Sequence, residues 1–143
     1  FKSEQHKKEF FQKWCGDYLK YCSDHFYLAI ENEKVLGYLS GHLNSIKALD
    51  DFIIPGPEVF KDCYDLYPAH FHINCHPNGQ GKGVGRKLVD HFSRELISEN
   101  INGVHLITST DADNLGFYRA LNFNKEFARP FNKIELLLMA KQL

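Results

Sequence analysis

The feature that most constrains this chain is a glycine-rich segment between a predicted strand and a predicted long helix. Residues 76–85 hold four of the ten glycines of the chain and follow an apolar stretch, Ala69–Cys75, that is typical of a strand. Apolar residues four apart, from Val84 to Leu96, then predict an amphipathic helix, and Val104–Ser109 predicts another strand. A strand, a long helix and a strand within this length predict a right-handed crossover between parallel strands.

A glycine-rich turn that leads into a helix is suited to binding a phosphate. Without Cβ atoms the backbone can approach a ligand closely, and successive N–H groups can point into one concavity. The helix dipole adds partial positive charge there, and Lys82, Arg86 and Lys87 raise the local potential further. The segment therefore predicts an anion site, the alternative being a flexible turn with a solvated basic rim.

The length and composition fit one soluble domain. The 143 residues are 43% hydrophobic and 14% aromatic, which favours an ordered core over disorder. Seventeen basic against eighteen acidic side chains exclude a general basic field for nucleic acid, and no apolar run is long enough to span a membrane. The four cysteines form no C-x-x-C pair, so we expect reduced thiols in a cytoplasmic protein, in preference to disulfides or a zinc site, and no metal is predicted.

Other segments predict elements before the crossover. We expect a helix over Ser3–Tyr21, capped by Ser3, and a hairpin of strands over His25–Ile30 and Val35–Leu43. Ser45–Pro57 is predicted to be irregular, and Glu58–Tyr67 is predicted to be a short helix.

The spacing of the glycines indicates a more specific site. A Walker motif is absent because no Gly-Lys pair is followed by Ser or Thr, and Arg86 stands where the Rossmann motif needs its third glycine. The spacing that fits is Gln80-x-x-Gly83-x-Gly85, which resembles the pyrophosphate loop, Gln/Arg-x-x-Gly-x-Gly/Ala, of the GNAT superfamily of acyl-CoA N-acyltransferases. Downstream, the run from Phe117 to Phe123 resembles the F-Y-x-x-L-G-F element of the same superfamily.

The resemblance implies one GNAT-like acetyltransferase domain over residues 1–143. The implied fold is α/β, with a mixed, mostly antiparallel sheet, a parallel, splayed strand pair and flanking helices. The resemblance covers about residues 25–141. Tyr67–Ile73, together with Gly103–Leu106, looks more narrowly like the acetyltransferase-like domain of bacterial O-GlcNAcase relatives. The first strand of that fold has no counterpart here, and Phe1 stands in place of Met, so we expect a truncated N-terminal strand.

The resemblance also implies acetyl-CoA as the co-substrate. Main-chain groups of Ile73 and Cys75 would pair with its pantetheine amides, and amides of the glycine-rich segment would hold its pyrophosphate. The residues expected to bind acetyl-CoA or coenzyme A are Ile73, Asn74, Cys75, Gln80, Gly81, Lys82, Gly83, Val84, Gly85, Arg86, Asp111, Asn114 and Phe117.

Two residues in this set of motifs depart from the pattern of the family. Asp111 replaces the usual Asn, where it is expected to cap the next helix, and Asn114 is expected to supply the lost hydrogen-bond donor. Asn122 replaces the usual Gly, and it should keep the left-handed turn because Asn tolerates that conformation.

Two residues are predicted to be catalytic. In the implied reaction an amine attacks the thioester directly, and Tyr118 is the acid that protonates the leaving thiolate, the alternative being a packed aromatic ring. His70, His72 and Asn74 share one face of their strand. His72 is the predicted base, with His70, His76 or a chain of water molecules as alternatives.

The sequence therefore predicts an N-acetyltransferase for a small or peptidyl amine, with neither nucleic acid nor membrane as a partner. The walls of the amine site are expected from Ser45–Leu66 and from the loop near Arg129. The alternatives are a non-catalytic acyl-CoA-binding or scaffold domain of the same fold and a nucleotide-phosphate binder of another kind. The terminal strand near Ile134–Met139 is a candidate surface for a homodimer.

Overall fold

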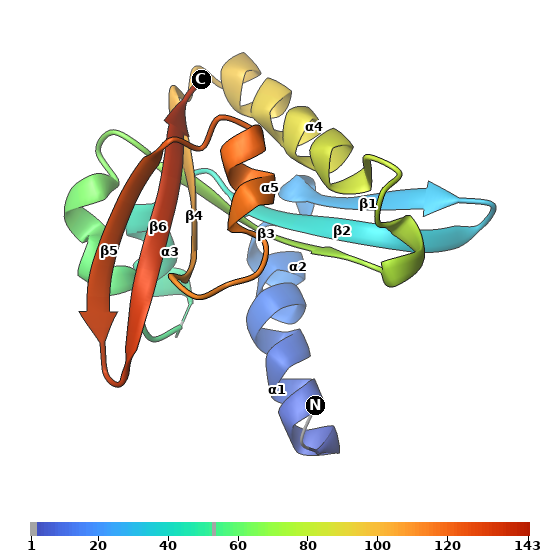
Figure 1. The fold of residues 1–143 in the computed structure, drawn as a ribbon, viewed down its shortest axis with the longest axis horizontal. Helices are drawn as coiled ribbons and strands as arrows, with labels where there is room; N and C mark the ends of the chain where they lie inside the picture. Colours follow the sequence, from blue (N-terminus) through green and yellow to red (C-terminus); the bar gives the residue numbers. More distant parts are fainter. Residues whose placement is uncertain (1–2, 53) are drawn as a thin grey trace. The chain divides into compact units, whose positions relative to one another are not determined.

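The computed structural model describes residues 3–52 and 54–143 and contains a mixed sheet with helices (Figure 1). Within those ranges the strand order is β1-β2-β3-β4-β6-β5. The strands are Phe26–Glu31 (β1), Lys34–His42 (β2), Ala69–Cys75 (β3), Gly103–Ser109 (β4), Lys125–Phe131 (β5) and Ile134–Gln142 (β6). The pair β3–β4 is parallel, whereas the pairs β1–β2, β4–β6 and β5–β6 are antiparallel. The predicted α/β class, with one parallel strand pair in a mostly antiparallel sheet, is confirmed.

The chain divides into two compact units, which we describe in turn. The first contains the described residues up to His42 together with His72–Phe92, and the second contains Leu43–Phe71 and Ser93–Leu143. In the described residues, no helix is both long enough and apolar enough to cross a membrane.

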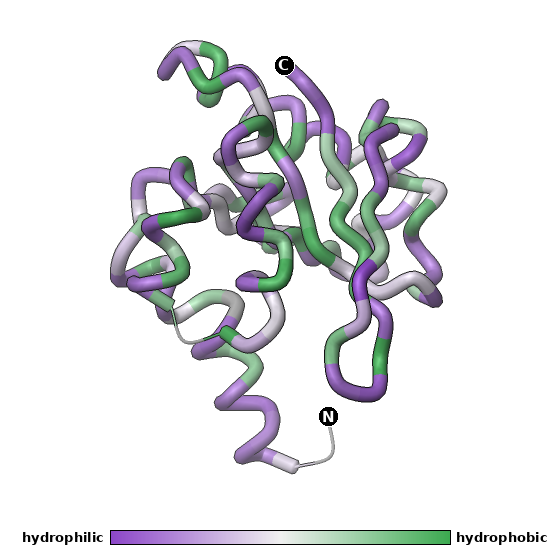
Figure 2. Tube along the Cα trace, turned by 90° about the vertical axis from the view of Figure 1, so that its left-hand side faces the viewer, coloured by the Kyte–Doolittle hydropathy of each residue, from purple (hydrophilic) through white to green (hydrophobic). Residues whose placement is uncertain are grey.

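The first unit begins with a helical segment in three parts. These are α1 (Glu4–Phe11), a π-helical turn, η1 (Gln12–Gly16), and α2 (Asp17–Tyr21). The predicted cap is confirmed, since the Ser3 side chain accepts a hydrogen bond from the His6 N–H at 3.1 Å. Figure 2 shows that α1 is mainly hydrophilic, in agreement with its lack of buried residues.

The hairpin β1–β2 packs against helix α4 (Val84–Ser98). Its two-residue turn, Asn32 and Glu33, is left-handed at both positions, with φ of 50° and 65°. The Tyr27 ring lies 4.8 Å from that of His91 and 6.1 Å from that of Phe92. A Cβ at Gly41 would lie 2.5 Å from the Phe92 ring, so this glycine allows the strand and the helix to approach closely.

The second unit is built on the antiparallel strands β4, β6 and β5, which lie side by side in Figure 1. Its helical elements are α3 (Ser45–Asp51), the 3-10 segment η3 (Pro57–Cys63) and α5 (Leu115–Ala120). Its core cluster consists of Phe60, Cys63, Tyr64, Tyr67, Leu138 and Ala140.

Three predictions for the second unit are wrong. Residues 45–51 are helical, because the Asn44 side chain caps α3 by accepting a hydrogen bond from the Lys47 N–H at 3.0 Å. The helix predicted over Glu58–Tyr67 is the earlier 3-10 segment η3, which starts at Pro57. The terminal strand β6 lies between β4 and β5, so its backbone pairs on both sides and offers no edge to a second copy.

Candidate active site

The glycine loop, residues 76–85, is fastened to the neighbouring strand β2 at its start. The His76 N–H donates to the Leu36 carbonyl at 2.7 Å, and a Cβ at Gly79 would lie 3.0 Å from that same carbonyl oxygen. The His76 side chain accepts a hydrogen bond from the Asn78 N–H at 3.1 Å, which caps a single 3-10 turn, η4 (Pro77–Gly79). These contacts fix the position at which the chain turns toward α4.

The end of the glycine loop has the backbone that the anion site needs. Gly81 and Gly83 have φ of +79° and +73°, a region that residues with a side chain rarely adopt. A Cβ at either position would meet no atom within 4 Å, so both glycines face open space. Val84 then begins α4, whose first N–H groups have no partner within the helix. The loop thus fits a pyrophosphate: it leaves room, supplies donors and lies at the positive end of a helix dipole.

Basic side chains surround this turn. Lys82, Arg86 and Lys87 are exposed. The Lys82 ammonium lies 3.5 Å from a carboxylate oxygen of Glu31, and both side chains are about half exposed, with 51% of their surface accessible. This ion pair is weak in water, so Lys82 can exchange it for a phosphate.

The predicted base, His72, lies in a buried environment within the first unit. Its ring centroid is 6.4 Å from that of Phe10 and 6.1 Å from that of Tyr38, on the strand face that it shares with Asn74. Burial, and secondarily the charge of Lys13, lowers the pKa of His72 to about 4. A charged imidazolium at His72 would therefore be poorly solvated.

The predicted acid, Tyr118, lies on α5 in the second unit. Its side chain is 5% exposed and packs among three aromatic rings, with centroids 6.4 Å (Phe71), 5.1 Å (Phe117) and 6.2 Å (Phe123) away. The phenol is therefore held in one orientation by its own helix and by β3.

The ends of α5 differ in one respect from the prediction. The N-terminal cap position belongs to Asn114 and not to Asp111, which lies in the preceding turn. At the other end Asn122 adopts φ of 68°, and the Phe123 N–H donates to the Tyr118 carbonyl at 3.1 Å. The predicted left-handed turn at Asn122 is confirmed.

A polar cluster that the sequence did not predict lies at the start of β3. The Nδ1 atom of His70 is 2.7 Å from the hydroxyl oxygen of Ser45, and that hydroxyl donates to the Pro68 carbonyl at 2.7 Å. On the neighbouring strand, the Nδ1 atom of His105 lies 2.8 Å from the Tyr67 carbonyl. We call Ser45, His70 and His105 the histidine cluster.

His105 is the more deeply buried of the two histidines in the histidine cluster. It is 1% exposed, and its ring stacks on that of Tyr64 with centroids 4.8 Å apart. Burial lowers the pKa of His105 to about 4, although its hydrogen bond to the Tyr67 backbone acts in the opposite direction. His105 is therefore neutral near pH 7. The alternation of side chains along Ala69–Cys75 made His70 a candidate base. No local sequence pattern indicated that Ser45 and His105 are its neighbours.

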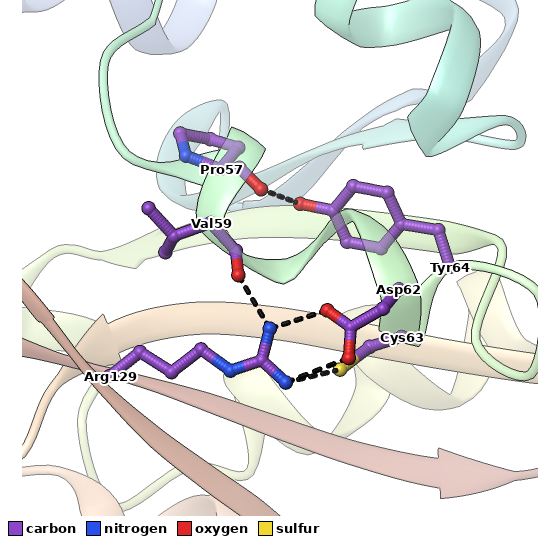
Figure 3. Close-up of polar contacts among 6 residues, drawn as sticks. All are labelled: Pro57, Val59, Asp62, Cys63, Tyr64 and Arg129. Atoms are coloured by element: carbon purple, nitrogen blue, oxygen red, sulfur yellow. Dashed lines mark hydrogen bonds and ion pairs between the residues drawn. The ribbon is translucent and has the colours of Figure 1, made fainter.

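Arg129 joins the two segments from which the walls of the amine site were predicted (Figure 3). From β5 its guanidinium donates to both carboxylate oxygens of Asp62 and to the Val59 carbonyl at 2.5 Å. The guanidinium also lies 5.2 Å from the Phe60 ring centroid. Its hydrogen bonds to Asp62 lower the pKa of that carboxyl group. One arginine therefore fastens η3 to β5.

The four cysteines are unbridged, and the structure places no metal-binding group of three or more His, Cys, Asp or Glu side chains within residues 3–52 and 54–143. Burial raises the pKa of the Cys15, Cys63 and Cys75 thiols, which keeps them protonated at neutral pH.

Comparisons with known proteins agree with the glycine loop and the sheet. A family model for the acetyltransferase (GNAT) domain matches residues 22–125. The crystal structure of SsHAT is similar with a TM-score of 0.72 and 19% identity, over 93% of this chain and 79% of that chain. The ribosomal-protein-S18-alanine N-acetyltransferase from Escherichia coli has a TM-score of 0.55 and 18% identity, over 82% of this chain and 67% of that chain. The structure of yncA from Salmonella typhimurium with its cofactor acetyl-CoA has a TM-score of 0.55 and 21% identity, over 82% of this chain and 64% of that chain.

Proposed function

The chain belongs to the GNAT acetyltransferase family, and we propose on that basis that it transfers an acetyl group from acetyl-CoA to a small or peptidyl amine. The observation that carries the proposal is the end of the glycine loop, where Gly81 and Gly83 have positive φ and face open space before α4. Support for an amine acceptor comes from structural neighbours such as the Escherichia coli enzyme, whose name states an alanine N-acetyltransferase.

The glycine loop would hold the pyrophosphate of acetyl-CoA through its main-chain amides, with Lys82 and Arg86 beside it. Main-chain groups of Ile73 and Cys75 would pair with the pantetheine amides. The residues that complete the proposed binding set are Asn74, Gln80, Gly81, Gly83, Val84, Gly85, Asp111, Asn114 and Phe117.

Tyr118 would donate its phenolic proton to the departing thiolate. Its packing among Phe71, Phe117 and Phe123 supports this role, because a general acid must be held in one orientation. The base would come from β3, where His70 and His72 share one face.

A second candidate function is a non-catalytic acyl-CoA-binding domain. The 5% exposure of Tyr118 favours it, because a phenol so deeply packed among rings also fits a purely structural role.

Two measurements on the same preparation separate the candidates. Calorimetric titration with acetyl-CoA and with CoA reports binding, and release of free thiol across a panel of small amines and N-terminal peptides reports turnover. Binding with amine-dependent thiol release supports the transferase. Binding without turnover by any amine favours the scaffold, and absence of binding overturns both.

A further inference from the structure

An acidic side chain of the first unit lies beside the glycine loop. Glu31 ends β1, and one of its carboxylate oxygens lies 3.5 Å from the Lys82 ammonium. Lys82 stands between Gly81 and Gly83, the two glycines whose positive φ shapes the proposed pyrophosphate site. The protein therefore places a negative charge of its own at the loop that is proposed to receive the negative charge of a ligand.

The backbone of the hairpin β1–β2 brings Glu31 to this place. Both positions of its two-residue turn are left-handed, which is typical of a tight hairpin that holds its two strands in register. On β2, the Leu36 carbonyl accepts a hydrogen bond from the His76 N–H at 2.7 Å, at the start of the glycine loop. A Cβ at Gly37 would lie 3.2 Å from the Val84 side chain, near the end of that loop. The contact between Glu31 and Lys82 thus follows from backbone that is attached at both ends of the glycine loop.

Glu31 also has a second cationic neighbour. Lys34 is its partner in the register of the hairpin, so the two side chains project from the same face of the sheet. Both are exposed, and cross-strand pairs of opposite charge are favourable. Glu31 can therefore turn to Lys34 when an anion takes Lys82, and the backbone need not move.

We propose that Glu31 competes with the pyrophosphate of acetyl-CoA for Lys82 and so weakens the binding of acetyl-CoA and of CoA. The inference rests on the proposed function, because it needs the pyrophosphate to lie at the glycine loop. A ligand must displace Glu31 before Lys82 can contact a phosphate, and the carboxylate that remains nearby repels that phosphate. Because the ion pair is half exposed, this competition is weak enough for the ligand to win.

The proposed role of Glu31 concerns affinity and not the chemical step. Acetyl-CoA and CoA carry the same pyrophosphate, and the acetyl thioester is at the opposite end of the pantetheine arm. Glu31 should therefore weaken the binding of substrate and product by the same factor. The return of Lys82 to Glu31 would favour the departure of CoA and limit inhibition by this product.

The matched pair of variants is Glu31→Gln and Glu33→Gln. Each removes one negative charge and keeps the size of the side chain, and both positions are exposed in the same hairpin. At low ionic strength we expect Glu31→Gln to lower the Kd of CoA and that of acetyl-CoA about threefold each, which is the size usual for an exposed ion pair. Titration calorimetry measures both constants. Glu33→Gln should leave both close to those of the wild type.

Lys82→Met shows whether the effect of Glu31 passes through Lys82. Methionine keeps most of the length of the lysine side chain but carries no charge. We expect Lys82→Met to weaken CoA binding several-fold, with the main-chain amides of the glycine loop retaining the ligand. Addition of Glu31→Gln to Lys82→Met should then give a much smaller gain in affinity than it gives in the wild type.

The outcomes separate the inference from the function beneath it. Unchanged affinity in Glu31→Gln overturns the competition, and weaker affinity overturns it by showing that Glu31 orients Lys82 for the ligand. Equal gains in Glu31→Gln and Glu33→Gln, or a full gain in the Lys82→Met background, also overturn it, because they indicate general charge repulsion. A wild type that binds CoA but acetylates no amine overturns the transferase and leaves the competition in place. Absence of CoA binding in the wild type overturns both.

Discussion

The glycine loop and the histidine cluster show two ways in which a chain can build a polar site. The glycine loop uses ten consecutive residues, 76–85, and presents main-chain groups. The histidine cluster uses side chains from α3, β3 and β4, with Ser45 and His105 sixty positions apart. The first is specified by local backbone preferences and the second by tertiary packing. A substitution in the loop should therefore affect binding, whereas substitutions in the second unit should affect turnover and stability.

The largest expected effect is that of Gly83→Val on acetyl-CoA binding. Gly83 has φ of +73° and faces open space, so a branched side chain would strain the turn and occupy the place proposed for the pyrophosphate. We expect titration calorimetry to detect no binding.

The matched control for Gly83→Val is Asn100→Val, just beyond the other end of α4. Asn100 is exposed and also has a positive φ, 60°, so valine imposes a similar backbone strain there. Thermal unfolding should show comparable losses of stability in the two variants, with acetyl-CoA binding kept in Asn100→Val. Normal acetyl-CoA affinity in a folded Gly83→Val protein would contradict the proposal that the glycine loop binds the pyrophosphate.

The next effect is that of Tyr118→Phe on turnover. Removal of the hydroxyl takes away the proposed acid but leaves the ring packed against Phe71 and Phe123. We expect kcat to fall about 100-fold or more, as is usual for a general acid, with little change in acetyl-CoA affinity. Tyr21→Phe, at an exposed position at the end of α2, is the control and should leave kcat unchanged. An unchanged rate in Tyr118→Phe would assign the tyrosine to packing.

The same contrast explains what the sequence could predict. The bounds of β3 were predicted correctly because successive side chains along Ala69–Cys75 alternate between polar and apolar, and because Pro68 precedes this stretch. The crossover to β4 was predicted because the apolar stripe of α4 has helical spacing. These are local patterns, and tertiary structure did not override them.

The errors, and the features that the sequence did not indicate, depend on other parts of the chain. Residues 45–51 have no long apolar stripe, and their helix depends on a single side-chain cap from Asn44. The low pKa of His72 results from burial beneath Phe10 and Tyr38, which come from other elements. The contact of Arg129 with Asp62 joins residues 67 positions apart, a separation at which one sequence carries no pairing signal.

The smallest expected effect concerns the pH dependence of stability, to which His105 in the second unit and His72 in the first unit contribute. The pKa of His105 is lowered from 6.5 to about 4 in the folded protein. As pH falls below 6.5 the unfolded chain takes up the proton first, so the stability contributed by neutral His105 is complete above that pH. It is lost progressively down to about pH 4, by roughly 1 kcal/mol per pH unit. His72 in the first unit should act in the same direction.

His105→Asn isolates the contribution of His105 to this pH dependence, because an Asn amide can keep the hydrogen bond to the Tyr67 carbonyl but does not titrate. Urea unfolding at pH 7, 6, 5 and 4.5 measures how the free energy of unfolding changes with pH. These values lie above the pH range in which carboxylates dominate that change. We expect a shallower slope in His105→Asn than in the wild type, and the shallowest slope when His72→Asn is added. A slope in His105→Asn parallel to that of the wild type would show that the pKa of His105 is the same in the folded and the unfolded protein.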